Sequence, residues 1–496
     1  MTDSQAIGLK RNAIGLREIL FQSITSMAPG AAISASIIAG ASYAGGSLPL
    51  ALIVALIASV FTAIAIGELA ARFPSAGSLA TYVLHGLHPG LGFLVGWGYV
   101  LVEALLPPLL FLQIGFVVTP VVHSAWSSWP ASLWWPWSVL AALLVAFLVF
   151  LGVQTSARAG TILGVFEGGV FLVLAVMFII HAGQNNTASV FTAAHIPQKY
   201  AGFAGIAAGS VYTVLAFTGF EAATPLAEES RNPRRNVRLA LVGSAIGIGL
   251  LYLLATYAVD VVFGPDKFAD FGVSGAASWI GLTKSVFGLA WVFIFFAIVN
   301  SCIANANAAT SASTRMGFAL GRANIFPRLL AAVHPRFRSP YVMVFVNLAV
   351  ALGVTLGFGL KWGPVNGFDL TATIIVLIDA AIYIVVDAAC IGYFWFRRRG
   401  EFNVFLHLIA PVIGIVVFIP AWIASAGLHL FSFVAPLTSP SSYAGVIAAA
   451  YMVIGLAYLL WLARTQQGRQ RVTAMGIAHY EAEPAEPTSG PFVSGA

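Results

Sequence analysis

Stretches of roughly 20 apolar residues, the length that an α-helix needs to cross a bilayer, recur about twelve times along this chain. In lipid, only helices and closed barrels satisfy every backbone polar group, so these runs predict membrane-spanning helices. The charge content agrees, because charged residues make up 8% of the 496 residues, against roughly 25% in soluble domains. We therefore expect an all-α integral membrane protein with about twelve transmembrane helices.

The predicted spans lie near residues 18–43, 47–70, 91–119, 136–156, 160–182, 204–229, 238–262, 286–314, 339–358, 369–395, 404–427 and 443–464. They divide the chain into a cytoplasmic N-terminus (1–17), a first group of five helices (18–182), a second group of five (204–395), two additional helices (404–464) and a disordered cytoplasmic tail (465–496). The tail is expected to be disordered because Pro484, Pro487 and Pro491 stand among glutamate and alanine residues after Arg471.

The basic residues predict the orientation of the spans. If the N-terminus is cytoplasmic, all but four of the 24 lysines and arginines fall in inner segments. The four outer residues are Lys199, Lys267, Lys284 and Lys361. Because inner loops of membrane proteins are enriched in lysine and arginine, both termini are expected to be cytoplasmic. The expected location is the cell inner (plasma) membrane.

Two of the spans contain helix-breaking residues at corresponding places. The first is interrupted at Ser26-Met27-Ala28-Pro29-Gly30, and the sixth at Thr218-Gly219. Since each group has an odd number of spans, the second group would insert with opposite topology to the first. Paired broken helices in inverted repeats indicate the binding site of a secondary transporter. The alternative is that proline and glycine only kink two ordinary spans.

Three motifs occur in order along the chain. They are Phe73-Pro74-Ser75-Ala76-Gly77; Ala216–Glu221 with Ala227–Pro233; and Ser313-Thr314-Arg315 with Gly321-Arg322, Phe326-Pro327 and His334-Pro335. Through these motifs residues 10–465 resemble the amino acid–polyamine–organocation (APC) family of permeases. The resemblance implies a LeuT-like inverted repeat of five plus five helices with two additional C-terminal helices. It also implies secondary active transport of amino acids or related amines by alternating access, coupled to protons or to exchange.

The sequence departs from the family pattern at two places. Many members carry a Gly-Ser-Gly type of break in the first span, where this chain has Ala28-Pro29-Gly30-Ala31. Some members have a bulky aromatic gate where Leu215 stands, so the gate is expected at Phe217 or Phe220.

The two breaks are expected to bind substrate through their backbone. A helix that restarts after Pro29 has free N–H groups at its positive end, which suit a carboxylate. The interrupted sixth span offers carbonyl oxygens for an ammonium group. The predicted donors are the N–H groups of Gly30, Ala31 and Ala32, and the predicted acceptors are the carbonyls of Ala216, Phe217 and Thr218. The full predicted substrate-binding set is Ser26, Met27, Gly30, Ala31, Ala32, Ala216, Phe217, Thr218, Gly219, Phe220, Glu221 and Glu103.

Three acidic residues within spans have open roles. Glu221 pairs with a cationic ligand, exchanges a proton, or caps the second half of its helix. Glu167 is a protonatable coupling residue, a cation ligand, or a carboxyl group satisfied by hydrogen bonds between helices. Glu103 lines the cavity and favours cationic substrates, or pairs with a polar neighbour away from the path. Proton coupling is assigned to Glu167 and Glu221, because burial disfavours a charged carboxylate.

Other polar residues in the spans favour structural roles. Asp379 and Asp387 are expected to form structural hydrogen bonds, and Asn300, Asn305 and Asn307 to join helices. A further charged group near the inner span ends forms either a cytoplasmic gate or an interfacial network that fixes topology. This group comprises Glu68 and Arg72, together with Glu228 and Glu229 beside Arg231, Arg234 and Arg235.

Other classes of protein have less support. The nine histidines form no HExxH-type metal pair and no phosphate-binding loop occurs, so we expect no enzyme, no catalytic residue, no metal and no cofactor besides a coupling proton. A channel has less support because this chain contains no short filter-like repeat. A membrane sensor remains an alternative. The expected partners are a small substrate and the lipid bilayer, with no nucleic acid. The oligomeric state is left open.

The charges within the spans bear on the substrate. Acidic residues without a lysine or arginine in the middle of any span favour a neutral or cationic ligand. A polyamine such as putrescine is therefore an alternative to a neutral amino acid. Proton symport and amino acid exchange are both retained as mechanisms.

Overall fold

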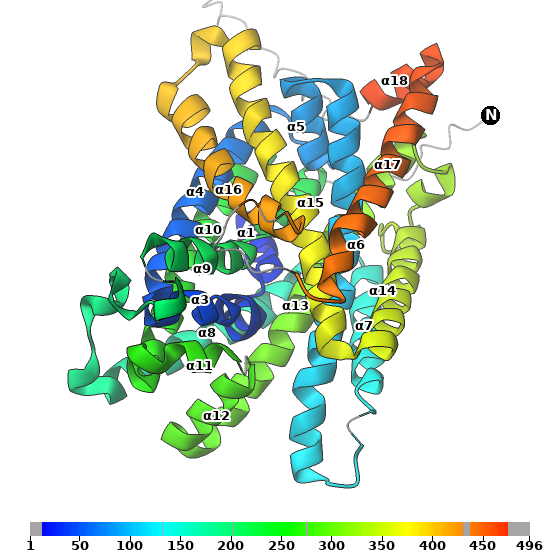
Figure 1. The fold of residues 1–496 in the computed structure, drawn as a ribbon. Helices are drawn as coiled ribbons and strands as arrows, with labels where there is room; N and C mark the ends of the chain where they lie inside the picture. Colours follow the sequence, from blue (N-terminus) through cyan, green and yellow to red (C-terminus); the bar gives the residue numbers. More distant parts are fainter. Residues whose placement is uncertain are drawn as a thin grey trace, which may run out of the picture.

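The computed structural model of the chain describes residues 12–130, 132–200, 202–273, 276–428, 430 and 437–474. The secondary-structure elements of these residues are helices. Among the described residues, the β-type pairing consists of one isolated bridge between Ile14 and Ser230. Figure 1 shows long helices crossing the molecule from one end to the other. The expectation of an all-α fold is confirmed.

The helices follow one another with short connections. Those of the first half are α1 (Leu16–Ser26), α2 (Pro29–Ala32), η1 (Ile33–Ile37), α3 (Ala41–Ala44), η2 (Gly45–Ser47), α4 (Leu48–Arg72), α5 (Ser78–Gly86), α6 (Pro89–Ala125), α7 (Trp135–Phe150), α8 (Val153–Ala182), η3 (Gly183–Asn185), η4 (Ala188–Phe191), η5 (Ala193–His195) and η6 (Gln198–Tyr200). The next group comprises α9 (Phe203–Leu215), η7 (Phe220–Glu229), α10 (Pro233–Phe263), η8 (Pro265–Lys267), α11 (Phe268–Val273), α12 (Ala276–Phe287), η9 (Gly288–Ala290), α13 (Trp291–Arg322), η10 (Arg328–Ala331), α14 (Tyr341–Trp362) and α15 (Pro364–Gly392). The last are η11 (Tyr393–Arg397), η12 (Arg399–Glu401), η13 (Phe405–Ile409), α16 (Ala410–Ser425), η14 (Ser441–Tyr443), α17 (Ala444–Ala463) and α18 (Gln466–Ala474).

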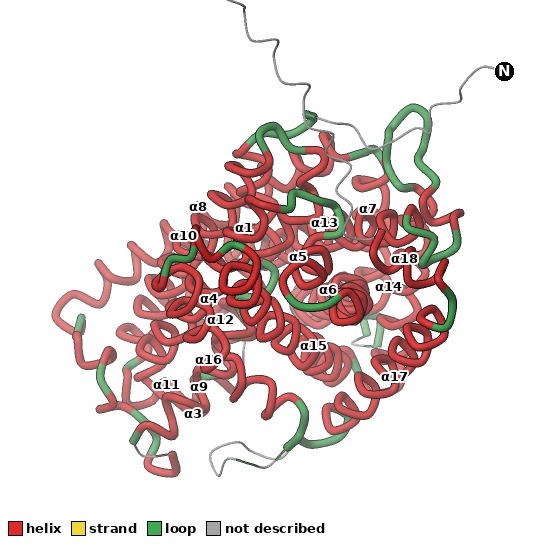
Figure 2. Tube along the Cα trace, turned by 90° about the horizontal axis from the view of Figure 1, so that it is seen from above, coloured by secondary structure: helices red, strands yellow, loops and turns green. Residues whose placement is uncertain are grey.

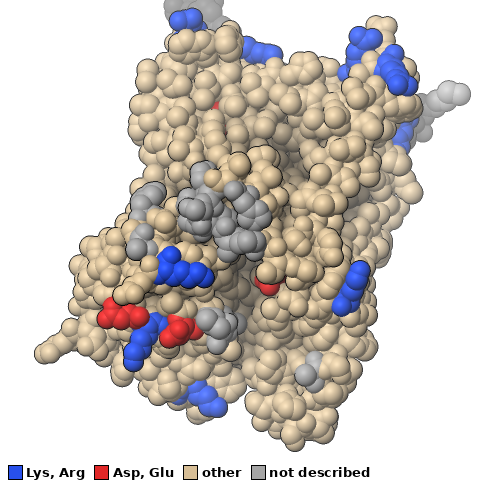
Figure 3. Space-filling view, viewed as in Figure 1, with Lys and Arg blue, Asp and Glu red and all other residues tan. Residues whose placement is uncertain are grey.

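Within the described residues, ten helical segments are long and apolar enough to cross a membrane. Two of the twelve expected spans fall outside this set. Helix α7 is apolar but has only 16 residues, and the first span is divided between α1, α2 and η1. Every expected span thus corresponds to helical structure. On the face in Figure 3, a broad band of uncharged residues separates the charged side chains near the end that carries α5 and α18 from those toward the opposite end.

Both expected breaks are present. Helix α1 ends at Ser26, and Ala28 adopts a left-handed conformation (φ 47°, ψ 66°) before α2 begins at Pro29. Proline suits the first position of a helix, because its missing N–H would have no partner there. In the sixth span α9 ends at Leu215, and Gly219 has φ 98°. The chain then continues as the ten-residue 3₁₀ helix η7, which is unusually long for this tight helix type.

Helices from the two predicted groups pack against one another in corresponding pairs. Helix α4 packs along α10, which are the second and seventh spans, and α6 packs along α13, which are the third and eighth. Figure 2 shows α6 nearly end-on within the bundle. This pairing is compatible with an inverted repeat, and the two groups and their boundaries stay a prediction.

The expectation of a disordered tail is wrong for its first part. Residues Gln466–Ala474 form helix α18, which packs against α17 and α6. Val472 is buried there, and the Gly468 N–H is bound by Thr465 Oγ1 at 3.0 Å, so apolar burial and a local cap order this segment. Residues 475–496 and 1–11 lie outside the described residues, so the predictions made for them are not addressed.

Candidate functional site

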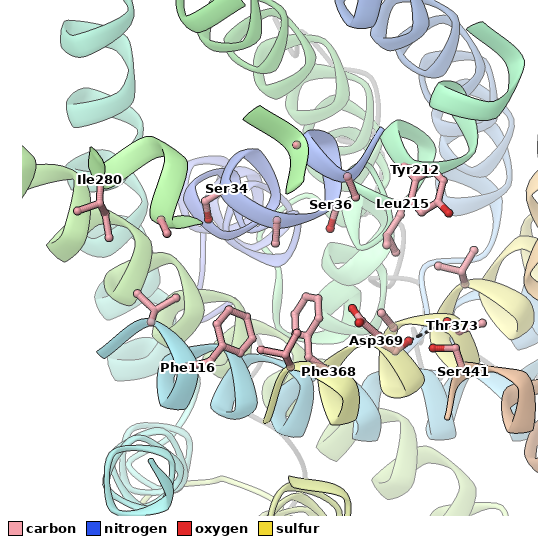
Figure 4. Close-up of a pocket in the computed structure, with 18 of the residues that line it drawn as sticks. Ser34, Ser36, Phe116, Tyr212, Leu215, Ile280, Phe368, Asp369, Thr373 and Ser441 are labelled. Carbon is pink, nitrogen blue, oxygen red and sulfur yellow. Dashed lines mark hydrogen bonds between the residues drawn. The ribbon is translucent and has the colours of Figure 1, made fainter. Parts of the chain in front are cut away.

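A cavity of about 1000 Å³ opens between α3, α6, α9, α12 and α15. It reaches the surface at the exposed Ser124 and Lys284. We call it the vestibule. The end of the molecule that carries Arg72, Arg238 and Arg322 lies away from this opening, and we call it the basic end. In Figure 4 the side chains of Tyr212, Leu215, Phe368 and Asp369 border the vestibule.

A smaller cavity of about 40 Å³ continues inward from the vestibule, and we call it the floor cavity. The two cavities share Ser36, Leu215, Phe368 and Ala372. Both helix breaks line the floor cavity, the first through residues 26–28 and 31–32 and the second through Leu215, Ala216 and Thr218. Side chains of α6, α13 and α15 also line it. The deepest space that joins the vestibule therefore lies between the two breaks.

The two breaks are in direct contact with each other. A Cβ atom on Gly219 would lie 2.7 Å from the Ser26 carbonyl oxygen, so only glycine fits this approach. Ser23 Oγ donates a hydrogen bond to the Phe220 carbonyl at 2.5 Å. The hydroxyl of Tyr252, on α10, lies 2.7 Å from the Met27 carbonyl oxygen and 2.9 Å from that of Ala216. Tyr252 thus bridges the breaks, a role that its position in an apolar span did not indicate.

The structure separates the predicted substrate-binding residues into two sets. Those that line the floor cavity are Ser26, Met27, Ala31, Ala32, Ala216 and Thr218. Those outside its lining are Gly30, Phe217, Gly219, Phe220, Glu221 and Glu103. The second set is buried in contacts between helices.

The expectation of free N–H groups at the first break is wrong for two of its three residues. The Ala31 N–H donates to Ser301 Oγ at 3.0 Å, and the Ala32 N–H donates to the Ala28 carbonyl at 2.7 Å. Gly30 faces protein, since a Cβ there would lie 2.9 Å from Phe171 Cε2. A bulky residue at position 30 would therefore disturb helix packing whether or not substrate binds nearby. On the sixth span, the Ala216 carbonyl is already bound by Tyr252.

The aromatic gate predicted at Phe217 or Phe220 is not at either residue. Both side chains are fully buried, Phe217 against Tyr252 with ring centroids 5.4 Å apart, and Phe220 against Tyr383 at 5.3 Å. The aromatic side chain between the vestibule and the floor cavity belongs to Phe368 of α15. The sequence around Phe368 did not indicate that its side chain would lie between the two cavities, because this placement depends on how α15 packs against other helices.

One of the three asparagines predicted to join helices differs from the others. Asn300 Nδ2 donates to the Leu163 carbonyl at 2.8 Å, and Asn307 Nδ2 to the Ser156 carbonyl at 3.1 Å, so both join α13 to α8. Asn305 instead lines the floor cavity, and its Oδ1 atom has no hydrogen-bond partner among the described residues. Ser26 Oγ is likewise buried and unpartnered there. These two oxygen atoms are available to a ligand.

Glu221 is fully buried behind the floor cavity. Its Oε2 atom accepts hydrogen bonds from the Tyr383 hydroxyl at 2.5 Å and from the Gly219 N–H at 3.2 Å. Because the second bond satisfies an N–H at the start of η7, this geometry agrees with the capping interpretation. The Oε1 atom has no partner among the described residues.

Glu103 and Asp379 are buried in the same region. Both lie close enough to Glu221 to interact with it electrostatically, and we call the three residues the acidic cluster. Both carboxylate oxygens of Glu103 are buried, and the Tyr99 side chain lies beside them. Like charges repel one another, so three carboxyl groups gathered here favour a cation nearby. In the described part of the chain, no group of His, Cys, Asp and Glu side chains is arranged to hold a metal ion.

Glu167 lies on the other side of the first break, on α8. It is fully buried, its Oε2 atom is 3.5 Å from Asn300 Nδ2, and Ser301 lies beside it. Ser301 Oγ also accepts the Ala31 N–H. One serine therefore lies between the carboxyl group of Glu167 and the backbone of the broken helix.

Charged and polar bonds join η7 to α13 and to the connection between α4 and α5 at the basic end. Arg322 donates two hydrogen bonds to Glu228 at 2.9 and 2.8 Å, and the Ala76 N–H donates to the same carboxylate at 3.0 Å. Arg315 Nε donates to Glu229 at 2.7 Å, with both side chains fully buried. We call these bonds the gate.

The partners in the gate differ from those predicted. The sequence placed Arg231, Arg234 and Arg235 beside Glu228 and Glu229, whereas Arg315 and Arg322 of α13 occupy those places. Arg231 Nε instead donates to the Asn12 carbonyl at 3.1 Å. Proximity in sequence suggested the wrong arginines because η7 directs its carboxylates toward α13. Glu68 pairs with Arg238 at 2.8 Å, and Arg72 pairs with Glu401.

Comparison with known proteins gives a consistent picture. The amino acid permease family model matches residues 18–474. The low-affinity putrescine importer PlaP of Escherichia coli K12 is 26% identical over 427 residues, covering 84% of this chain and 85% of that protein. An uncharacterized transporter of Mycobacterium tuberculosis is 26% identical over 466 residues, covering 93% of both chains. The branched-chain amino acid permease BcaP of Bacillus subtilis is 25% identical over 360 residues, covering 68% of this chain and 74% of that protein.

The family match spans most of the chain and includes both helix breaks and the gate residues. The resemblance in the three motifs is thereby confirmed, and the helical spans agree with a multi-pass membrane protein. The chain belongs to the amino acid permease family, and it is a transporter of amino acids or related amines rather than an enzyme.

Proposed function

We propose that this protein is a proton-coupled secondary active transporter that works by alternating access, with its basic end in the cytoplasm. The vestibule then opens outward, and the gate closes the inward path. The distribution of lysine and arginine supports this orientation. An open cavity at one end and a closed, ion-paired opposite end are the arrangement expected of one outward-facing state in an alternating-access cycle.

The substrate binds at the floor cavity, which must widen to hold it because about 40 Å³ is the space of one or two water molecules. The observation that carries this proposal is that Ser26 Oγ and Asn305 Oδ1 are buried and unpartnered in a space lined by both breaks. Buried polar atoms normally have a hydrogen-bond partner, and a bound ligand would supply one. The ammonium group of a substrate donates hydrogen bonds, which these two oxygen atoms can accept.

The lining of the floor cavity favours a neutral substrate with an apolar side chain. Leu106, Leu109 and Leu110 contribute one wall, and the described lining contains no charged side chain. The similarity to a branched-chain amino acid permease supports this choice. A putrescine-like amine is the second candidate, supported by the similarity to a putrescine importer and by the acidic cluster behind the cavity.

Glu167 carries the coupling proton in this proposal. Its contact with Ser301, and through it with the Ala31 N–H, gives a route by which protonation alters the first break. Glu221 is the second coupling candidate, but one of its oxygens already holds Tyr383 and Gly219. A carboxyl group that couples must change its bonding during the cycle, and the 3.5 Å contact between Glu167 and Asn300 is longer than either hydrogen bond of Glu221.

The test is uptake into proteoliposomes with labelled leucine and labelled putrescine, under an imposed pH gradient and in counterflow. We expect saturable counterflow and gradient-driven accumulation of at least one substrate. The Asn305→Ala variant should raise KM by about 10- to 150-fold, since a charge-assisted hydrogen bond contributes roughly 1.5–3 kcal/mol. Asn366→Ala is the matched control, because Asn366 is exposed and binds only the Trp362 carbonyl among described residues. Flux without counterflow would identify a channel instead.

A further inference from the structure

The vestibule contains a second polar site that lies outside the floor cavity. Asp369 is in α15, next to Phe368, and its exposed side chain borders the vestibule. Thr373 Oγ1 bonds the Asp369 backbone carbonyl at 2.7 Å and leaves the carboxylate unengaged. Within the described part of the chain, no residue forms a hydrogen bond or ion pair with that carboxylate. An exposed carboxylate without a cationic partner attracts cations.

Two tyrosines border the same part of the vestibule. Tyr43 of α3 and Tyr212 of α9 have stacked rings with centroids 5.0 Å apart, and their hydroxyl oxygens are 3.0 Å apart. Tyr212 lies close enough to Asp369 to interact with it electrostatically. Aromatic faces and hydroxyl oxygens both attract an ammonium group, so these tyrosines complement the carboxylate.

The other charge in the described vestibule lining is positive and lies away from Asp369. Lys284 is on α12, one turn beyond Ile280, and Figure 4 shows Ile280 at the opposite side of the cavity from Asp369. Lys284 Nζ is 5.9 Å from the centroid of the Trp291 ring. The carboxylate of Asp369 is therefore not neutralised by this lysine.

We infer that Asp369, Tyr43 and Tyr212 form an outer loading site for the ammonium group of alkyl amines, through which cationic substrates pass before they reach the floor cavity. The inference rests on the proposed outward-facing path. Alkyl diamines should bind here better than amino acids, because a zwitterion brings a carboxylate that Asp369 repels. Asp369 then determines specificity by raising the affinity for cations without changing the floor cavity.

The test measures binding and transport separately. Ligand-induced thermal shifts of the purified protein give an apparent Kd for putrescine and for leucine, and uptake gives KM and maximal rate. The variants are Asp369→Asn, Asp369→Glu and, as the matched control, Asp270→Asn. Asp270 is an exposed acid of α11 outside the vestibule lining.

We expect Asp369→Asn to weaken putrescine binding by about fivefold, the upper range for a solvated ion pair, and to leave leucine unchanged. Asp369→Glu should retain most of the affinity, and Asp270→Asn should behave as wild type. High salt should weaken putrescine binding to the wild type more than to Asp369→Asn. Equal effects on both ligands, or no effect on putrescine, would overturn the inference. Failure of wild-type uptake would refute the proposed transport function while the binding comparison still decides the role of Asp369.

Discussion

The gate and the vestibule are opposite in chemistry although they lie on one path. The gate is held by ion pairs, with Arg315 and Glu229 fully buried and Arg322 bidentate to Glu228. The vestibule has one acidic and one basic residue in its described lining, and these two do not pair. Closure at one end is therefore specified by directional bonds, whereas the open end is shaped by apolar packing.

The difference indicates which of the two ends costs more free energy to rearrange. To open the basic end, the transporter must separate charged partners and rehydrate them, which is costly unless water enters at the same step. To close the vestibule, it needs only to bring apolar and aromatic groups such as Leu215 and Phe368 together. We therefore expect variants of the gate to change stability and state, and variants of the vestibule to change affinity.

The largest effect should come from Arg315, because its loss leaves a buried charge without a partner. The Arg315→Met variant should lower the free energy of unfolding by roughly 3–5 kcal/mol, the usual cost of removing one partner of a buried ion pair. The measurement is thermal unfolding of the detergent-solubilised protein. Arg328→Ala, at an exposed arginine bound to Asn324, should change stability by less than about 0.5 kcal/mol. A variant at position 315 as stable as wild type would refute the contrast between the two ends.

Glu167 tests whether coupling resides beside the first break. For one proton per substrate, each pH unit of gradient supports about tenfold accumulation. In the Glu167→Gln variant this dependence on the gradient should be lost, while counterflow exchange continues. The measurement is accumulation in proteoliposomes at several imposed gradients. Glu221→Gln is the comparison, and it should keep the gradient dependence because the Glu221 carboxylate is already bound by Tyr383 and the Gly219 N–H. The reverse pattern would move the coupling role to Glu221.

The pair of Arg322 and Glu228 tests the gate itself. Arg322→Gln should shift the protein toward inward-open states by about fivefold, since the pair is partly exposed and contributes roughly 1 kcal/mol. The readout is alkylation of a cysteine placed at Ser36, in a background without Cys302 and Cys390. Alkylation from the vestibule side should slow. The control is Arg398→Gln, which removes an exposed pair with Glu401 at the same end. Unchanged alkylation in the Arg322 variant would mean that this pair does not hold the gate.

The sequence predicted the local features of this fold and few of its contacts. Twelve apolar runs predicted the spans, and Pro29 and Gly219 predicted the breaks, because these signals depend on the residue alone. The partner of Glu229 could not be predicted, since Arg315 is 86 positions away and reaches it only through helix packing. The position of Phe368 between the two cavities also depends on helix packing and could not be predicted. Nor could the sequence show that Asn305 lines the floor cavity while Asn300 and Asn307 join helices.

Tyr252 offers the smallest expected effect and the most direct link between the two ends. Its hydroxyl contacts the carbonyls of Met27 and Ala216, so it holds both breaks at a fixed spacing. Tyr252→Phe removes one hydrogen bond at a cost of about 1 kcal/mol, and KM should rise two- to fivefold. The ion pairs of the gate are intact in this variant, so alkylation at Ser36 should not change. Substrate uptake should still slow, because the spacing of the two breaks is altered. A change in alkylation as large as that of Arg322→Gln would show instead that the spacing of the breaks, and not the ion pairs, determines which end is open.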